Sequence, residues 1–343
     1  MIRFECDYTT GAHPKILEAL VNTNDEACPG YGVDLHCERA RAMLRELCQA
    51  PEAGVHFLVG GTQANATIIS AALRPHQGAL CAETGHINTH ETGAIEAAGH
   101  KVLALPASEG KITAQQIHDY CEAHHTNPAW EHTVQPGMVY LSHPTELGTV
   151  YTLAELEAIH ETCKRWRLPL FVDGARLAAG LAASDITLPD LARLCDAFYL
   201  GGTKAGLLFG EAVVIPNPNL NHDFRYLIKQ HGGMLAKGRL LGVQFEAFLK
   251  DGLFLEIGRQ EVAQAMRLRE AFLAKGWNLF VDSASNQQFP ILPNGAVAVL
   301  RHKYSFEVWE KVDQAHTAVR FCTSWSTTDA DVDALIEDIR GLP

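Results

Sequence analysis

The alternation of two kinds of sequence, from about residue 40 to residue 215, most constrains what this chain can fold into. Short apolar runs, typical of buried strands, take turns with stretches whose apolar residues recur every three or four positions, as on the buried face of a helix. Strands that alternate with helices in this way pair in parallel, because each helix carries the chain back across the sheet. We therefore predict an α/β fold with a mostly parallel sheet covered by helices.

The unit between residues 138 and 172 shows this pattern most clearly. Residues 138–141 form an apolar run, and Thr152 with Glu155 three positions later is the capping box that begins a helix. Residues 170–172 form the next apolar run, of the kind that is buried on both faces of a sheet. The same reasoning predicts strands at residues 55–59, 197–200 and 211–215, and a helix over 64–73.

The pattern changes after Pro216. We expect helices over residues 245–255 and 257–273, short strands near 297–300 and 319–322, and a last helix that begins at Thr327 or Thr328. Strands and helices in this arrangement form an α+β unit. We therefore predict two domains, residues 1–245 and residues 246–343.

The charge balance excludes one class of partner. The 343 residues include 28 lysines and arginines against 40 aspartates and glutamates, a formal net charge of −12, whereas a nucleic-acid-binding protein needs a positive field. No apolar run approaches the roughly 18–20 residues of a membrane span, and the charged first residues do not resemble a leader peptide. We expect neither a nucleic-acid nor a membrane partner.

Cysteine and histidine spacing gives no metal signature. The nine cysteines are an odd number without a CxxC pair, which favours buried reduced thiols in a cytoplasmic protein over disulfides or a zinc knuckle. His86 and His90 stand four residues apart with Glu91 beside them, but their order is not HExxH. We therefore expect no metal site.

The first of three candidate motifs is the stretch at residues 59–65, which joins a predicted strand to a predicted helix through two glycines. A glycine turn at the start of a helix exposes N–H groups that suit a phosphate. An ordinary strand–turn–helix corner has the same pattern.

The other two motifs also follow predicted strands. Asp173 and Arg176 stand where an open α/β sheet presents functional side chains, and a local salt bridge between them is the alternative. Lys204 lies in a glycine-rich turn, and a lysine amine can form an imine with a carbonyl compound. A solvated loop lysine is the alternative there.

The combination of the three motifs is more specific than any one of them. Pyridoxal phosphate needs a turn for its phosphate, an acid that keeps its ring nitrogen protonated, and a lysine that holds its aldehyde. Lys204 follows Asp173 by 31 residues, with an apolar run between them.

In these motifs the sequence resembles the threonine aldolase branch of the fold-type I pyridoxal phosphate enzymes, within the wider β-eliminating lyase group. The matching stretches run in the same order over nearly the whole chain: residues 31–32, 60–65, 83–86, 173–176, 201–204 and 320–325. The resemblance implies a large domain whose mostly parallel, seven-stranded sheet lies between helices, and a small α+β domain at the C-terminal end.

The resemblance also implies a role for each matching residue. Lys204 holds the cofactor, Asp173 pairs with the pyridine nitrogen, and His86 lies against the ring. The remaining cofactor contacts are Gly61, Thr62, Gln63, Arg176, Thr203 and Lys229, with Arg225 as a further cation across a subunit interface. The substrate contacts are Cys6, Tyr31, Arg176 and Arg320, with the two arginines on the carboxylate.

Two positions depart from the family pattern. Cys6 stands where the family often has serine, and Glu146 stands where many members have histidine. These departures leave open the side-chain specificity and the general base, for which His86 and a water held by His86 or Glu146 are the candidates.

The resulting hypothesis is an aldolase that cleaves L-threonine, L-allothreonine and related L-β-hydroxy-α-amino acids, such as phenylserine, to glycine and an aldehyde. The alternatives are another pyridoxal phosphate reaction on the same scaffold, such as β-elimination, and a non-catalytic module that kept the fold. The resemblance implies a homo-oligomer, either a dimer or a dimer of dimers.

Overall fold

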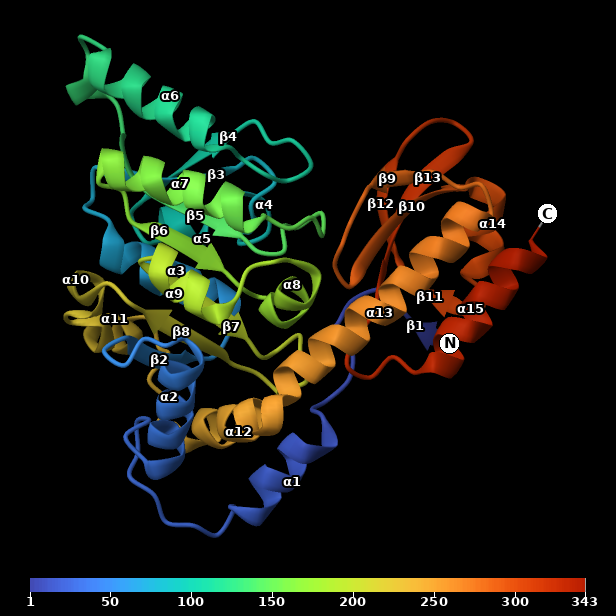
Figure 1. Ribbon diagram of the computed structural model, residues 1–343, viewed down its shortest axis with the longest axis horizontal. Coiled ribbons are helices and arrows are strands. Elements are labelled where there is room, and N and C mark those ends of the chain that lie inside the picture. The colour runs from blue at the N-terminus through green and yellow to red at the C-terminus, as the bar shows by residue number, and fades with distance from the viewer. Residues whose placement is uncertain (343) are drawn as a thin grey trace.

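The computed structural model describes residues 1–342, and a seven-stranded sheet forms the centre of its larger part (Figure 1). The strands lie in the order β2 (Gly54–Leu58), β8 (Glu211–Ile215), β7 (Ala197–Gly201), β6 (Leu170–Asp173), β5 (Gln135–Ser142), β3 (Gln77–Ala82) and β4 (Lys101–Leu105). Only β8 runs against its neighbours, β2 and β7. The predicted mostly parallel sheet is confirmed.

Two layers of helices cover the two faces of this sheet. One face packs under α2 (Leu35–Leu47), α6 (Ala114–Thr126), α7 (Leu153–Trp166), α8 (Leu177–Ala183), α9 (Leu188–Leu194) and α12 (Arg239–Leu249). The other packs under α3 (Gly61–Ala72), α4 (His86–Thr89), α5 (Ala94–Ala97), α10 (Pro218–Asn221) and α11 (Phe224–Gln230).

Alternation along each strand explains why both faces are buried. In β5, Val139 and Leu141 belong to the core on one face, whereas Met138 and Tyr140 belong to the core on the other. Successive side chains of a strand point to opposite faces, so a strand between two helical layers must be apolar throughout. The continuous apolar runs of the sequence are the result.

Helix ends follow the predicted caps. Thr152 accepts a hydrogen bond from the backbone N–H of Glu155 at the start of α7, and the two residues form the predicted capping box. Thr328 makes the same box with Asp331 at the start of α15 (Asp329–Gly341). The outermost helix, α1 (Pro14–Asn22), packs beside α12, and a short 3-10 turn, η1 (Trp130–His132), precedes β5.

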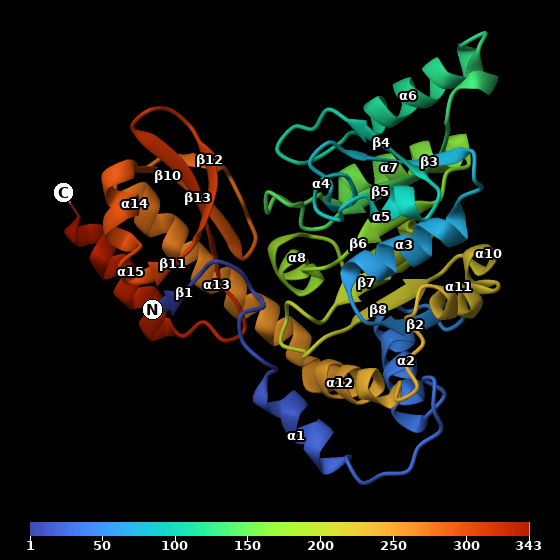
Figure 2. The ribbon, with the colours of Figure 1, turned by 180° about the vertical axis from the view of Figure 1, so that it is seen from behind.

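The C-terminal part contains a second, antiparallel sheet in the order β12 (Glu307–Lys311), β13 (His316–Cys322), β10 (Gln287–Pro293) and β9 (Leu279–Val281). Helices α13 (Leu253–Ala274), α14 (Asn294–Leu300) and α15 pack with it around a separate apolar core. Figure 2 shows α13 running from the large sheet to the small one.

The N-terminal segment crosses to this smaller part. Strand β1 (Ile2–Arg3) pairs in parallel with β11 (Tyr304–Ser305), and Phe4 belongs to the C-terminal apolar core. Both ends of the chain therefore lie on the same side of the molecule (Figure 1). No helix among residues 1–342 is long and apolar enough to cross a membrane.

Two predicted elements were wrong in detail. Residues 297–300 were expected to form a strand, but they belong to helix α14, where Val297 and Leu300 bury one face at a three-residue step. The helix expected over 245–255 is interrupted by η2 (Lys250–Gly252), because Asp251 and Gly252 both have positive φ angles. Tertiary packing outweighs the strand propensity of valine in the first case.

Close packing of two helices gives a test of this fold. A Cβ atom on Gly258 of α13 would lie 2.2 Å from the carbonyl oxygen of Ala178 in α8. Gly258→Ala is therefore expected to lower the free energy of unfolding by roughly 1–3 kcal/mol through overpacking. Gly295→Ala in α14 is the matched control, because a Cβ atom added there would have no neighbour within 4 Å. It should be neutral or stabilise by up to about 1 kcal/mol. Urea denaturation of both variants measures the difference, and equal effects would contradict the packing argument.

Candidate active site

A cavity of about 320 Å³ lies between the large sheet and the small one. Its lining contains five residues that the sequence predicted, His86, Glu146, Arg176, Lys204 and Arg320. The first four follow strands β3, β5, β6 and β7, and the last lies on β13. Carboxyl ends of neighbouring parallel strands meet at one edge of a sheet, which is why residues far apart in the sequence come together here.

A buried carboxylate lies at this edge, at the end of β6. The two oxygens of Asp173 accept hydrogen bonds from the hydroxyls of Tyr140 (2.6 Å) and Tyr199 (2.5 Å), the amide of Asn65 (2.9 Å) and the backbone N–H of Ala175 (3.0 Å). Burial alone would raise the pKa of this carboxyl, but the charge of the nearby histidine and these donors lower it. Asp173 is thus held ionised.

A chain of polar contacts connects this carboxylate to the cavity. The amide of Asn65 donates to Glu91 (2.6 Å) as well as to Asp173, and the same Glu91 oxygen lies 2.7 Å from Nδ1 of His86. Although burial lowers the pKa of His86, the contact with Glu91 and the charge of Asp173 raise it more. The imidazole of His86 is therefore oriented, and its pKa is raised above the ordinary value.

Lys204 follows β7, and its amine has no hydrogen-bond or ion-pair partner among residues 1–342. Enclosure in the protein and the charge of Arg176 lower the pKa of this amine. A lowered pKa increases the neutral fraction of an amine, and the neutral form is the one that attacks a carbonyl carbon.

Arg176 is held by a residue from the N-terminal segment. Its Nε and Nη2 atoms donate to the two oxygens of Asp7 at 2.6 and 3.1 Å, in a bidentate pair. Asn286 also donates to Asp7 (3.0 Å). The alternative of a local salt bridge between Arg176 and Asp173 is therefore wrong, because the guanidinium faces Asp7 instead.

Arg320 enters the cavity from the small sheet. It donates to the side chain of Gln287 (3.0 Å) and the carbonyl of Glu5 (3.1 Å), pairs with Glu307, and lies over the ring of Trp309. Its Nε atom is buried without a partner among the described residues. Two arginines thus approach one cavity from two sheets.

Glu146 lines the same cavity and follows β5 in the chain. One of its oxygens accepts hydrogen bonds from the hydroxyl of Ser142 (2.5 Å) and the backbone N–H of His86 (2.9 Å). Burial raises the pKa of this carboxyl, and the charge of Asp173 raises it further. A carboxyl with a raised pKa exchanges protons more readily near neutral pH than an ordinary one.

The start of α3 lies at the same edge of the sheet. No side chain caps it, and its first helical hydrogen bond runs from the N–H of Ala64 to the carbonyl of Gly60. The N–H groups of Gly61, Thr62 and Gln63 therefore have no helical partner, and the helix dipole adds positive potential there. This is a site for an anion such as a phosphate.

These observations fit the residues that pyridoxal phosphate requires. The unpaired amine of Lys204, the ionised carboxylate of Asp173 and the uncapped start of α3 supply the three expected contacts. Two predicted side chains have other partners. The amide of Gln63 bonds to the backbone of Val59 and His231, and the hydroxyl of Thr203 donates to Glu211.

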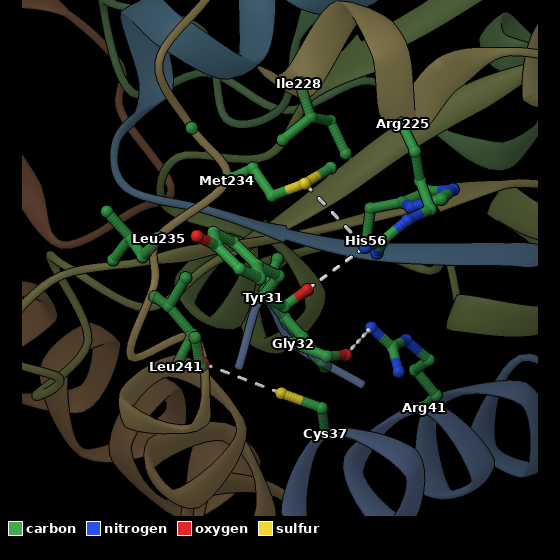
Figure 3. A pocket seen from close by; sticks show the side chains of 13 residues that line it. Tyr31, Gly32, Cys37, Arg41, His56, Arg225, Ile228, Met234, Leu235 and Leu241 are labelled. Carbon is green, nitrogen blue, oxygen red and sulfur yellow. Dashed lines mark hydrogen bonds between the residues drawn. The ribbon is translucent and has the colours of Figure 1, made fainter. Parts of the chain in front are cut away.

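Four other predicted residues do not line this cavity. Cys6 is half-buried beside Asp7, while Tyr8 takes the place at the cavity wall. Tyr31, Arg225 and Lys229 lie together in a different region, where the Lys229 amine is 5.0 Å from the Tyr31 ring and Arg225 donates to the Tyr31 carbonyl. Figure 3 shows Tyr31 and Arg225 of this group. Within one chain the structure does not bring these three to Lys204.

Several residues of the site escaped sequence reasoning. They are Asp7, Tyr8, Glu91, Tyr140, Tyr199, Glu307 and Trp309, together with Asn65 as a partner of Asp173. Two of them carried a signal, because Asn65 ends the glycine motif and Asp7 adjoins Cys6.

Comparison with known proteins agrees with this geometry. A family model described as Beta-eliminating lyase matches residues 4–319. The chain belongs to this family, whose members and fold-type I relatives depend on pyridoxal phosphate. Membership places it among the carbon–carbon lyases, and the family predicted from the motifs is confirmed.

Its relatives define the branch more narrowly. A low specificity L-threonine aldolase from Pseudomonas aeruginosa is 31% identical over 98% of this chain and 97% of its own length. A structure of a Leishmania major threonine aldolase superposes with a TM-score of 0.96, at 44% identity over 99% of each chain. An aspartate aminotransferase from Thermus thermophilus, 14% identical over 100% of this chain and 92% of its own, has a TM-score of 0.70 and shares the fold. The predicted fold class is confirmed.

A second buried acid near Lys204 gives a pH test. Glu211 is 3% exposed, and burial raises its pKa to about 8 from 4.5. The unfolded chain therefore loses this proton at lower pH than the folded one, and the apoprotein should lose stability as pH rises from about 4.5 to about 8. Glu211→Gln, which keeps the acceptor for Thr203, should remove this loss.

Urea denaturation of both apoproteins at several pH values measures the effect. The variant should become more stable than the original chain as pH rises, by an amount on the order of a few kcal/mol at the upper end. A difference that does not change with pH would contradict the raised pKa.

Proposed function

We propose that this chain cleaves L-threonine, L-allothreonine and related L-β-hydroxy-α-amino acids, such as phenylserine, to glycine and an aldehyde. The observation that carries the proposal is the unpaired Lys204 amine, which faces a cavity lined by two arginines and lies within the influence of the charge of Asp173. Names of the relatives support the substrate class.

Pyridoxal phosphate is the proposed cofactor, held by Lys204, Asp173, His86 and the N–H groups at the start of α3. When bound, it supplies an aldehyde with which amines condense and a cationic ring that withdraws electrons from Cα of the substrate. Asp173 keeps the negative charge that stabilises a protonated ring nitrogen, a charge fixed in place before any reaction.

Arg176 and Arg320 orient the substrate. A guanidinium can donate two hydrogen bonds to one carboxylate. Asp7 holds the side chain of Arg176 in place, and Gln287 holds that of Arg320. A carboxylate bound in this way fixes which bond at Cα stands perpendicular to the cofactor ring. The Cα–Cβ bond is the one that must break to give glycine.

Glu146 is the proposed general base. Nδ1 of His86 is already paired with Glu91, and this contact raises the pKa of His86, which increases the fraction that cannot accept a proton. Burial raises the pKa of Glu146 and makes its carboxylate a stronger base. Glu146, directly or through a water, takes the proton of the β-hydroxyl as the Cα–Cβ bond breaks. The Cβ–O bond becomes the carbonyl of the aldehyde, and Cα keeps the electron pair until it is protonated to glycine.

A homo-oligomer, a dimer or a dimer of dimers, is the proposed assembly. Tyr31 and Tyr226 are 48% and 77% exposed, and they border an open pocket with Arg225, Lys229 and Met234. Tyrosine, methionine and arginine side chains are enriched in protein–protein interfaces. In such an assembly Tyr31, Arg225 and Lys229 would reach the site of another subunit.

The domain division and location remain proposals as well. Residues 1–245 and 246–343 are the proposed domains, supported by the separate apolar core of the C-terminal part, although Phe4 packs into that core and Pro343 lies outside the described residues. A cytoplasmic location is supported by nine cysteines without a disulfide.

Product analysis tests the activity. With threonine, allothreonine or phenylserine we expect glycine and the matching aldehyde, because the arginines present the Cα–Cβ bond for cleavage. A keto acid and ammonia would instead indicate β-elimination. Lys204→Ala should abolish glycine release and the visible absorbance that borohydride reduction bleaches as it fixes the cofactor to the protein. Lys164→Ala, at an exposed lysine of α7, is the matched control and should change neither.

A second experiment tests the base. Glu146→Gln should lower kcat by roughly 10²–10⁴-fold with little change in KM, because a base acts after binding. It should also remove the acidic limb of the kcat/KM profile, where protonation of Glu146 inactivates the original chain. His86→Asn should keep that limb. If His86→Asn loses the limb and Glu146→Gln keeps it, the base is His86.

A further inference from the structure

A cluster of three different side chains lies far from the cavity, in the loop between α1 and α2. Glu26 and Cys28 come from this loop, and His36 is the second residue of α2. One atom of each, a carboxylate oxygen, the sulfur and an imidazole nitrogen, lies within 4.8 Å of the other two. Figure 1 shows the loop at the edge of the molecule, next to α12.

The three side chains are a donor set for a divalent transition metal. Zinc takes sulfur at about 2.3 Å and nitrogen or oxygen at about 2.0 Å, so that ligand atoms in a tetrahedral site lie about 3.3–3.6 Å apart. Nε2 of His36 and an oxygen of Glu26 are already 2.8 Å apart. Small side-chain movements therefore suffice, and a thiolate with a carboxylate balances the charge of a divalent cation.

A fourth residue fixes the imidazole for this role. Nδ1 of His36 lies 2.6 Å from a carboxylate oxygen of Glu246 in α12. A metal-binding histidine usually donates its second nitrogen to a carboxylate, which sets the tautomer and makes the free nitrogen a better ligand. His36 is 7% exposed, so its orientation is set by the protein, whereas the Glu26 side chain is 49% exposed and leaves access for water.

We propose that Glu26, Cys28 and His36 bind one zinc-type divalent cation, with Glu246 as the partner that orients His36 and solvent at the fourth position. Nε2 of His36 then coordinates the metal, which replaces the proton between this nitrogen and Glu26. The sequence did not reveal this site, because the spacing ExC followed by a histidine eight residues later matches no metal motif.

The metal would fix the loop that carries Tyr31. Without it, the loop is tied to α12 by hydrogen bonds from Arg239 to the carbonyls of Thr23 (2.6 Å) and Asn24 (2.9 Å). Binding at Glu26 and Cys28 would add an anchor in the middle of the loop. Binding to the folded chain alone raises its stability by mass action.

Zinc titration of the untagged, full-length protein after dialysis against a chelator tests the proposal. We expect saturable uptake of one Zn²⁺ per chain by calorimetry and a thermal midpoint that rises with Zn²⁺. With Cd²⁺ we expect a thiolate charge-transfer band in the ultraviolet difference spectrum. The absence of saturable uptake would show that the cluster is only an imidazolium between two carboxylates, and would overturn the proposal.

Variants assign the ligands. Cys28→Ser should remove the Cd²⁺ band, whereas Cys6→Ser, at the other cysteine that is not buried, should keep it. Glu26→Gln, at an exposed side chain, should weaken Zn²⁺ binding at least 10-fold without affecting folding. Glu246→Gln should weaken it by roughly 10–100-fold and keep the band. A band that survives in Cys28→Ser would place the thiolate elsewhere and refute the site.

Discussion

The buried, ionised carboxylate of Asp173 is the constraint on which the rest of the site depends. A lone charge in an apolar core is costly, so the protein surrounds it with donors from several elements: Tyr140 on β5, Tyr199 on β7 and Asn65 on α3. These hydrogen bonds connect three neighbouring strands and one helix. The same arrangement sets the positions of the loops that carry Glu146 and Lys204.

Much of the fold was predictable, because local sequence and tertiary structure agree in most elements. The apolar runs that became β5, β6, β7 and β8 are buried on both faces, and such strands need no polar alternation. Agreement fails at α14, where two valines suggested a strand. The small core there is filled by Val297 and Leu300, which lie three residues apart on one face of the helix. A short apolar stretch of sequence does not show that the core requires this spacing.

The site was only partly predictable, for a related reason. Lys204 lies in a glycine-rich turn and Asp173 at the end of an apolar strand, and both positions leave a local signal. Asp7 leaves only its position beside Cys6 as a signal, because its partner Arg176 is 169 residues away and the pair forms only when the N-terminal segment crosses to the small sheet. The proposed ligands Glu26, Cys28 and His36 are close in the sequence, but their spacing matches no metal motif.

The crossing of the N-terminal segment to the small sheet also determines when, during synthesis of the chain, the site can form. Phe4 donates its N–H to the carbonyl of Ser305 and accepts from the N–H of Cys322, at 2.8 Å each. During synthesis Phe4 therefore waits for partners that the ribosome adds about 300 residues later. Until then Arg176 lacks the carboxylate that orients it, and Arg320 has not been made. A nascent chain can thus form its sheet and carry its reactive lysine while it still has no place for a substrate carboxylate.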